Sequence, residues 1–127
     1  MKKIIAPDAP AAIGPYAAAI RSGNWIICSG QTPLNPKTMK IQGDTIEEQT
    51  QVALQNLEAV LQTEACNRNH IIKTSVFLKN FADFPKMNAA YAAFFGEHTP
   101  ARTTVEVSRL PMDALVEIEC IAEIQAQ

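Results

Sequence analysis

Alternation of side-chain type along short segments is the feature that most constrains the fold of this chain. In each of three segments, two sets of side chains alternate with the period of two that belongs to a β-strand. These segments are residues 71–78, 102–108 and 115–124. Arg21-Ser22-Gly23-Asn24 supplies turn residues between 16–20 and 25–29, so a β-hairpin is predicted there, preceded by loop or strand at 3–5.

Only two segments have the pattern of an amphipathic helix. Thr45-Ile46-Glu47-Glu48 reads as a capping box that starts a helix with one apolar stripe to about Cys66. Asp83 can cap the second helix, with Pro85 in its first turn and Gly96 as its stop. The expected order is strand, strand, helix, strand, helix, strand, strand. Two helices cover one face of such a sheet, so the other face meets water or another subunit.

The charge content favours a subunit on the uncovered face. Charged residues make up 19% of the 127 residues, below the roughly 25% that is typical of a soluble globular chain. The length fits a single domain, residues 1–127. The net charge of −2 and the lack of a basic run argue against a nucleic-acid or anionic-membrane binder.

The lengths of the apolar segments and the spacing of the cysteines indicate the cellular compartment. No apolar run approaches the roughly 20 residues that span a bilayer, and Pro7 and Pro10 interrupt any signal-peptide core, so a cytoplasmic protein without membrane contact is expected. Cys28, Cys66 and Cys120 are odd in number and lack metal-site spacing, so neither disulfides nor a metal site is predicted. The first and last of these should be buried in strands, and Cys66 should be more exposed.

Arg102 and Glu117 are the main candidates for chemistry. Each is a charged residue inside a predicted strand. A guanidinium binds a carboxylate in a bidentate fashion, and a nearby carboxylate can orient or deprotonate a water molecule. If the two strands are neighbours, both side chains could face one pocket. The alternative, favoured by spacing alone, is a cross-strand ion pair or two solvated side chains.

Several motifs, in order along nearly the whole chain, resemble those of the RidA proteins, also called the YjgF family. The motifs are Ala12-Ile13-Gly14-Pro15-Tyr16, Ile27-Cys28-Ser29-Gly30-Gln31-Thr32-Pro33, Lys73-Thr74-Ser75-Val76-Phe77-Leu78, Met87-Asn88-Ala89-Ala90-Tyr91, Pro100-Ala101-Arg102-Thr103-Thr104-Val105-Glu106-Val107, Leu110-Pro111 and Val116-Glu117-Ile118-Glu119.

The resemblance implies a chorismate-mutase-like α/β fold, with a mixed sheet and two helices on one face. It also implies a homotrimer whose sheets line a central barrel, with active sites between subunits. The implied reaction is hydrolysis of 2-imino acids to 2-oxo acids and ammonia, without metal or organic cofactor. These imino acids arise from enamines such as 2-aminoacrylate and 2-aminocrotonate, which pyridoxal-phosphate enzymes such as threonine dehydratase release.

The resemblance also implies residue roles. Arg102 would bind the substrate carboxylate and Glu117 would hold or activate the water. Other residues would shape the pocket, some from the neighbouring subunit: Tyr16, Ser29, Gly30, Asn88 and Thr104. Many relatives carry Ser and then often Cys after the signature arginine, where this chain has Thr103 and Thr104, so substrate preference stays open.

Two other function classes remain. A non-catalytic binder of 2-oxo acids or related carboxylates would need Arg102 alone, with Glu117 as a structural residue. Ribonuclease, translation-inhibitor or chaperone-like activities are attributed to some relatives, although the lack of a cationic patch argues against RNA.

Overall fold

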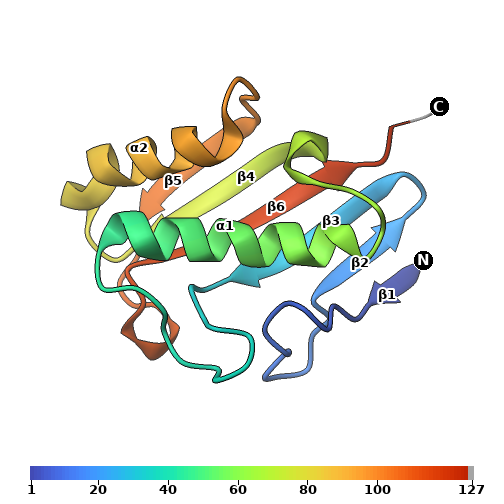
Figure 1. The fold of residues 1–127 in the computed structure, drawn as a ribbon, viewed down its shortest axis with the longest axis horizontal. Helices are drawn as coiled ribbons and strands as arrows, with labels where there is room; N and C mark the ends of the chain where they lie inside the picture. The colour runs from blue at the N-terminus through green and yellow to red at the C-terminus, as the bar shows by residue number, and fades with distance from the viewer. Residues whose placement is uncertain (126–127) are drawn as a thin grey trace.

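The alternating segments form one mixed sheet of six strands, which a computed structural model describes over residues 1–125. The strands in chain order are β1 (Lys2–Ile4), β2 (Ala19–Ser22), β3 (Trp25–Gln31), β4 (Ile71–Leu78), β5 (Ala101–Glu106) and β6 (Val116–Glu123). Their order across the sheet is β1-β2-β3-β6-β4-β5, with β4 and β5 parallel and every other pair antiparallel. The C-terminal strand therefore lies in the middle of the sheet (Figure 1).

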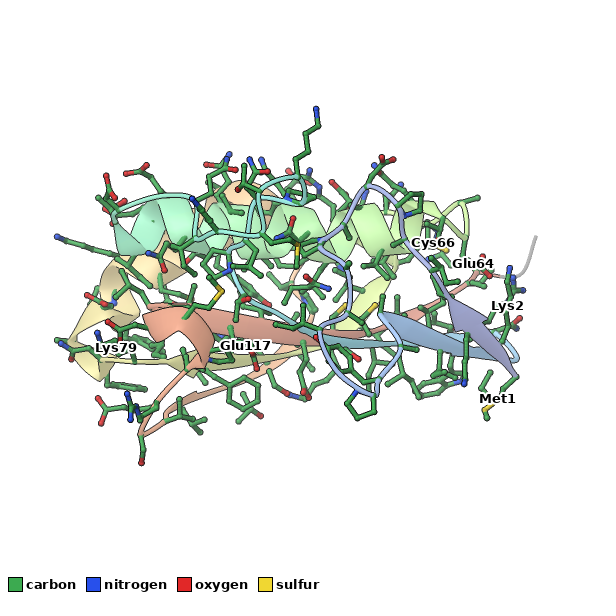
Figure 2. The ribbon with its side chains drawn as sticks, turned by 90° about the horizontal axis from the view of Figure 1, so that it is seen from below. Met1, Lys2, Glu64, Cys66, Lys79 and Glu117 are labelled. Atoms are coloured by element: carbon green, nitrogen blue, oxygen red, sulfur yellow. The ribbon has the colours of Figure 1, made fainter. Side chains whose placement is uncertain are left out.

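Both helices lie on the same face of the sheet, as the sequence predicts. Figure 1 shows α1 (Ile46–Gln62) along the middle of the sheet and α2 (Phe84–Phe95) at the β5 end. Seen edge-on in Figure 2, the helices form one layer and the sheet the other, with side chains on the far side that no other layer covers. In β6, the helix-facing side chains are almost fully buried: Val116, Ile118, Cys120 and Ala122.

The first helix begins where its cap is predicted and ends earlier. The Thr45 hydroxyl accepts a hydrogen bond from the backbone N–H of Glu48 at 3.1 Å. The return bond of a capping box is different, because the Glu48 carboxylate accepts from the Thr45 hydroxyl and not from its backbone N–H. The helix ends at Gln62, short of Cys66, because the chain turns through a left-handed residue, Ala65, at φ 57°.

The second helix has Pro85 in its first turn and ends at Gly96, where φ is 66°, as predicted. Asp83 is the N-cap residue, as predicted, but its side chain makes no capping hydrogen bond. The side chain of Asn80 instead accepts from the Ala82 N–H and starts a short 3-10 helix that leads into α2. The polar start signal therefore lies three residues before the predicted cap.

The N-terminal hairpin forms, although its first strand is shifted. β2 begins at Ala19, so Tyr16 lies in the preceding loop and not in a strand. Residues 2–4 pair with β2 as an edge strand. The Glu64 carboxylate, just after α1, binds Lys2 at 3.0 Å and Arg21 at 3.3 Å, which ties this edge to the helix layer. Figure 2 shows Lys2 and Glu64 at the same end of the molecule.

In β5, polar side chains face the helices and an apolar side chain is exposed, which is the reverse of an ordinary strand with one face in solvent. Arg102 and Thr104 are partly buried toward the helices, whereas the apolar Val105 is 40% exposed on the open face. Ile27 of β3, 48% exposed, also lies on that face. In β5, Arg102 and Thr104 thus point inward beneath α2, whereas Thr103 and Val105 point outward.

Two further findings concern residues outside the sheet. Cys66 is buried, contrary to the prediction, because it follows the helix end and its N–H bonds back to Leu61. Within residues 1–125, neither helix has the length and apolar content that a membrane span requires.

Candidate active site

Arg102 projects from β5 toward α2 and lies against two aromatic rings. Its guanidinium carbon is 4.7 Å from the centre of the Tyr91 ring and 5.6 Å from the centre of the Phe84 ring. Both rings belong to α2. A cation–π contact of this kind attracts a guanidinium without a hydrogen-bond acceptor atom.

A second arginine under the same helix shows what a structural guanidinium does here. Arg68 lies 3.8 Å from the Phe94 ring, also on α2. Its nitrogens bind both carboxylate oxygens of Glu58, at 2.7 and 2.9 Å, and the backbone oxygen of Phe94, at 2.6 Å. Among residues 1–125, by contrast, no ion pair or side-chain hydrogen bond involves Arg102. Its charge is therefore free for an external anion.

Two buried oxygens near Arg102 also lack hydrogen-bond partners in the described part of the chain. They are Oδ1 of Asn88, on α2, and Oγ1 of Thr104, two residues along β5. Asn88 and Arg102 line a hollow of about 490 Å³ together with Tyr91. A buried polar group without a partner costs free energy unless a ligand or water satisfies it. Arg102, Asn88 and Thr104 are thus brought together as predicted site residues.

Glu117 lies in a different place, above a glycine of the neighbouring strand. A Cβ atom on Gly30 would be only 2.9 Å from Oε2 of Glu117, so the glycine leaves the space that this carboxylate fills. Both residues line a small pocket of about 70 Å³ with Tyr16 and Pro111. Burial, and secondarily the charge of Glu119, raises the pKa of Glu117. A carboxyl group with a raised pKa accepts protons more readily than an ordinary one.

Ser29 and Tyr16 belong to the Glu117 side of the molecule. The Ser29 hydroxyl donates to the backbone oxygen of Ala17 at 2.6 Å, and the Ser29 N–H donates to Ala18 at 3.0 Å. These bonds hold the loop that carries Tyr16, whose side chain is 49% exposed. Ser29 therefore positions the loop, and Tyr16 forms part of the pocket wall.

The predicted site residues thus form two groups on opposite faces of the sheet. Val116 and Ile118 face the helices, so Glu117 between them faces the open side, whereas Arg102 faces α2. Their strands are also separated by β4. One chain therefore provides neither a common pocket nor a cross-strand ion pair for Arg102 and Glu117, which corrects both sequence interpretations of the pair.

Sequence reasoning missed Tyr91 and Phe84 as neighbours of the arginine. Their seven-residue separation places them on one face of the predicted helix. The usable signal was a tyrosine within a stripe of phenylalanines, because a buried phenol needs a polar partner. In residues 1–125, no three His, Cys, Asp or Glu side chains are grouped as a metal site would require.

Comparison with known proteins gives consistent results. The sequence model of the family described as Endoribonuclease L-PSP matches residues 6–124. A RutC family protein of Pyrococcus horikoshii is 49% identical over 123 residues, which are 96% of this chain and 98% of that protein. The protein of Escherichia coli K12 named 2-iminobutanoate/2-iminopropanoate deaminase is 47% identical over 124 residues, 95% of this chain and 96% of its own length. The crystal structure of the Escherichia coli YjgF gene product superimposes with a TM-score of 0.93 at 45% identity, covering 98% of this chain and all of that one.

Proposed function

The chain belongs to the Endoribonuclease L-PSP family, which includes the YjgF and RidA proteins, and on this basis we propose that it is a hydrolytic deaminase. Its substrates would be 2-imino acids, and its products 2-oxo acids and ammonia. A relative that is 47% identical over nearly the full length of both chains carries the name of this activity.

The observation that carries the proposal is the unpaired guanidinium of Arg102. A 2-imino acid carries a carboxylate next to its reactive carbon, and a planar guanidinium binds a carboxylate through two parallel N–H···O bonds. Tyr91 and Phe84 are the cation–π neighbours of Arg102 and make no hydrogen bond to it. The site is therefore suited to a small planar anion.

Glu117 would supply the second requirement of the reaction, a base for water. The imine carbon is electrophilic once its nitrogen is protonated, so no strong nucleophile is needed. A water oxygen bonds to this carbon while Glu117 takes one water proton. Glu117 then returns this proton to the nitrogen of the carbinolamine, the C–N bond breaks and ammonia leaves, and the carbinol O–H proton passes to water as the oxo group forms. No electrons are gained or lost overall.

A shared site for Arg102 and Glu117 would require a second copy of the chain. The two residues lie on opposite faces of the sheet in one chain. We therefore propose the homotrimer that the family resemblance implies, with Arg102, Asn88 and Thr104 from one subunit and Glu117, Gly30 and Tyr16 from its neighbour. Ser29 would hold the Tyr16 loop at that boundary.

Hydrolysis can be tested on an imine made in the assay. Threonine dehydratase releases the enamine of 2-iminobutanoate, and the protein should accelerate the appearance of 2-oxobutanoate. Arg102→Ala should abolish the acceleration, whereas Arg109→Ala, which removes the same charge from an exposed position, should not. Full acceleration by Arg102→Ala would refute its assigned role.

Two further measurements separate the other function classes. A Glu117→Ala protein that still binds 2-oxobutanoate but no longer accelerates its formation supports the enzyme. A wild-type protein that binds 2-oxobutanoate but does not accelerate its formation would be a carboxylate-binding protein, with Glu117 as a structural residue. RNA cleavage that is lost in Arg102→Ala would instead favour a nuclease.

A further inference from the structure

Tyr91 connects the candidate anion-binding arginine to the interior of the sheet. Its hydroxyl is hydrogen-bonded to Oγ1 of Thr74 at 2.8 Å, and both side chains are buried. Thr74 is also the residue of β4 that pairs with Arg102 of β5 in the parallel ladder. The ring under the guanidinium is thus fixed to the strand next to the one that carries the guanidinium.

The second ring beside Arg102 is fixed in a similar way. Phe84 stacks on Phe81 with ring centres 5.0 Å apart. The backbone N–H of Phe81 donates to the carboxylate of Glu106 at 2.8 Å, and Glu106 is the last residue of β5. Both rings that flank Arg102 are therefore held by residues of β4 or β5.

We propose that Tyr91, locked by Thr74, is the positioning residue that sets the plane of the Arg102 guanidinium for a carboxylate ligand. The proposal rests on the proposed function in one respect only, which is the choice of a carboxylate as the ligand. Phe84 also contacts the guanidinium and plays the lesser part, because its ring centre is farther away.

The physical reason is the absence of any other restraint on the arginine head group. Arg68 is held by Glu58, whereas the described residues offer Arg102 no acceptor. An arginine side chain that must be ordered by its ligand loses affinity through the entropy of ordering. A ring fixed in advance reduces that loss.

The chemistry of Tyr91 itself fits this role. Burial raises the pKa of its hydroxyl, so the side chain stays neutral and keeps its hydrogen bond to Thr74 throughout the pH range of ordinary assays. The hydrogen bond to Thr74 and, less strongly, the charge of Arg102 lower this pKa, and Cys120 raises it, but burial has the largest effect. The ring thus remains an uncharged platform.

The test measures binding of 2-oxobutanoate, a stable carboxylate, by titration calorimetry with the intact protein. Tyr91→Leu should weaken binding roughly tenfold, because the stacking partner is lost. Tyr91→Phe, which keeps the ring, should recover most of the affinity. Thr74→Val removes only the hydrogen bond to Tyr91, so its affinity for 2-oxobutanoate should lie between those of Tyr91→Leu and Tyr91→Phe. Phe94→Leu is the matched control, because Phe94 is equally buried on the same helix and stacks on Arg68 instead.

A purely structural role is distinguished by a double-mutant cycle. In an Arg102→Ala background, Tyr91→Leu should cause no further loss of 2-oxobutanoate affinity, since Tyr91 acts through the guanidinium. Turnover should show a raised KM with a smaller change in kcat. Equal weakening by Tyr91→Leu and Phe94→Leu, or additive effects in the cycle, would overturn the proposal. If Arg102→Ala itself leaves 2-oxobutanoate binding unchanged, it is the proposed function that fails.

Discussion

Arg102 and Glu117 lie on opposite faces of the sheet, with strand β4 between the strands that carry them. One is next to the rings of α2, and the other is in a small pocket behind Gly30. Any reaction that uses both side chains at one carbon atom requires two chains. The active unit of this protein is therefore expected to be a boundary between copies.

Mixing two inactive variants should restore activity. Arg102→Ala and Glu117→Ala are each expected to be inactive in imine hydrolysis. When the two are co-expressed or refolded together, a site formed by an intact Arg102 and an intact Glu117 from different chains arises at about a quarter of the boundaries. The formation of 2-oxobutanoate measures the recovery. Each variant refolded alone is the control, and a mixture as inactive as its components would contradict a shared site.

The loss of activity at low pH should reflect the protonation of Glu117. Burial raises the pKa of this carboxyl group, so it becomes protonated, and inactive as a base, at a pH above the ordinary glutamate value of 4.5. A plot of kcat/KM against pH should therefore fall toward acid with an apparent pKa above 4.5. Glu117→Gln should lose both the activity and this acid limb. If Glu117→Gln keeps a residual activity that falls toward acid in the same way, another group causes that fall.

The same raised pKa predicts a stability effect of definite sign. A carboxyl group with a higher pKa in the folded state favours folding fully below its unfolded pKa, and this contribution is lost as the pH rises through the folded pKa. Glu117→Gln should therefore melt at a higher temperature than the wild type at pH 7. Below pH 4.5 the difference should vanish, because the carboxyl group is then neutral in both states.

Gly30→Ala should reduce turnover without much effect on stability. The added Cβ would be 2.9 Å from the Glu117 carboxylate and would displace it, while φ at this position is not in the left-handed region. A displacement of about 1 Å can cost on the order of a hundredfold in rate. We expect kcat to fall and affinity for 2-oxobutanoate to remain.

Gly23→Ala is the control for the glycine substitution. It has φ of 61° and open space around its Cβ position, so alanine there should lower stability by about 1 kcal/mol and leave kcat unchanged. Thermal unfolding and steady-state rates on the two variants should show opposite patterns. Equal loss of stability in both would mean that Gly30 is needed for the register shift between β3 and β6, which lies between Cys28 and Gln31, and not for Glu117.

The sequence predicted local structure better than it predicted neighbours. The limits of β4 and the Thr45 cap depend on side chains close in sequence, and both are confirmed. The position of β6 between β3 and β4 depends on long-range pairing, which no local pattern contains. For that reason the arginine and the glutamate were both found as candidates, while their separation on two faces was not.

The sense of the alternation in β5 was equally beyond local patterns. Polar residues at alternate positions usually face water, yet Arg102 and Thr104 face α2 while Val105 is exposed. The register of β5 against β4 sets this sense, because Thr74, which is hydrogen-bonded to Tyr91 of α2, pairs with Arg102. Local alternation alone does not contain that pairing.

The two arginines beneath α2 should differ in their effect on stability. Arg68→Ala removes a bidentate bond to Glu58 and should cost about 1–2 kcal/mol, a figure reduced by the partial exposure of the pair. Arg102→Ala removes no hydrogen bond of the described chain and should cost at most about 1 kcal/mol, from its ring contacts. Urea unfolding measures both values. A larger cost for Arg102→Ala would indicate a structural role.

The two threonines that face α2 should respond with opposite signs to replacement by valine. Thr104 has a buried hydroxyl without a partner in residues 1–125, so Thr104→Val should raise the free energy of unfolding by about 1 kcal/mol. Thr74 makes a hydrogen bond to Tyr91, so Thr74→Val should lower it by a similar amount. If the Thr104 hydroxyl is kept for a ligand, the more stable variant should also bind 2-oxobutanoate less tightly or turn over the imine more slowly. Urea unfolding and calorimetry on the two variants check both halves, and a Thr104→Val protein that is less stable than the wild type would show that this hydroxyl serves the fold.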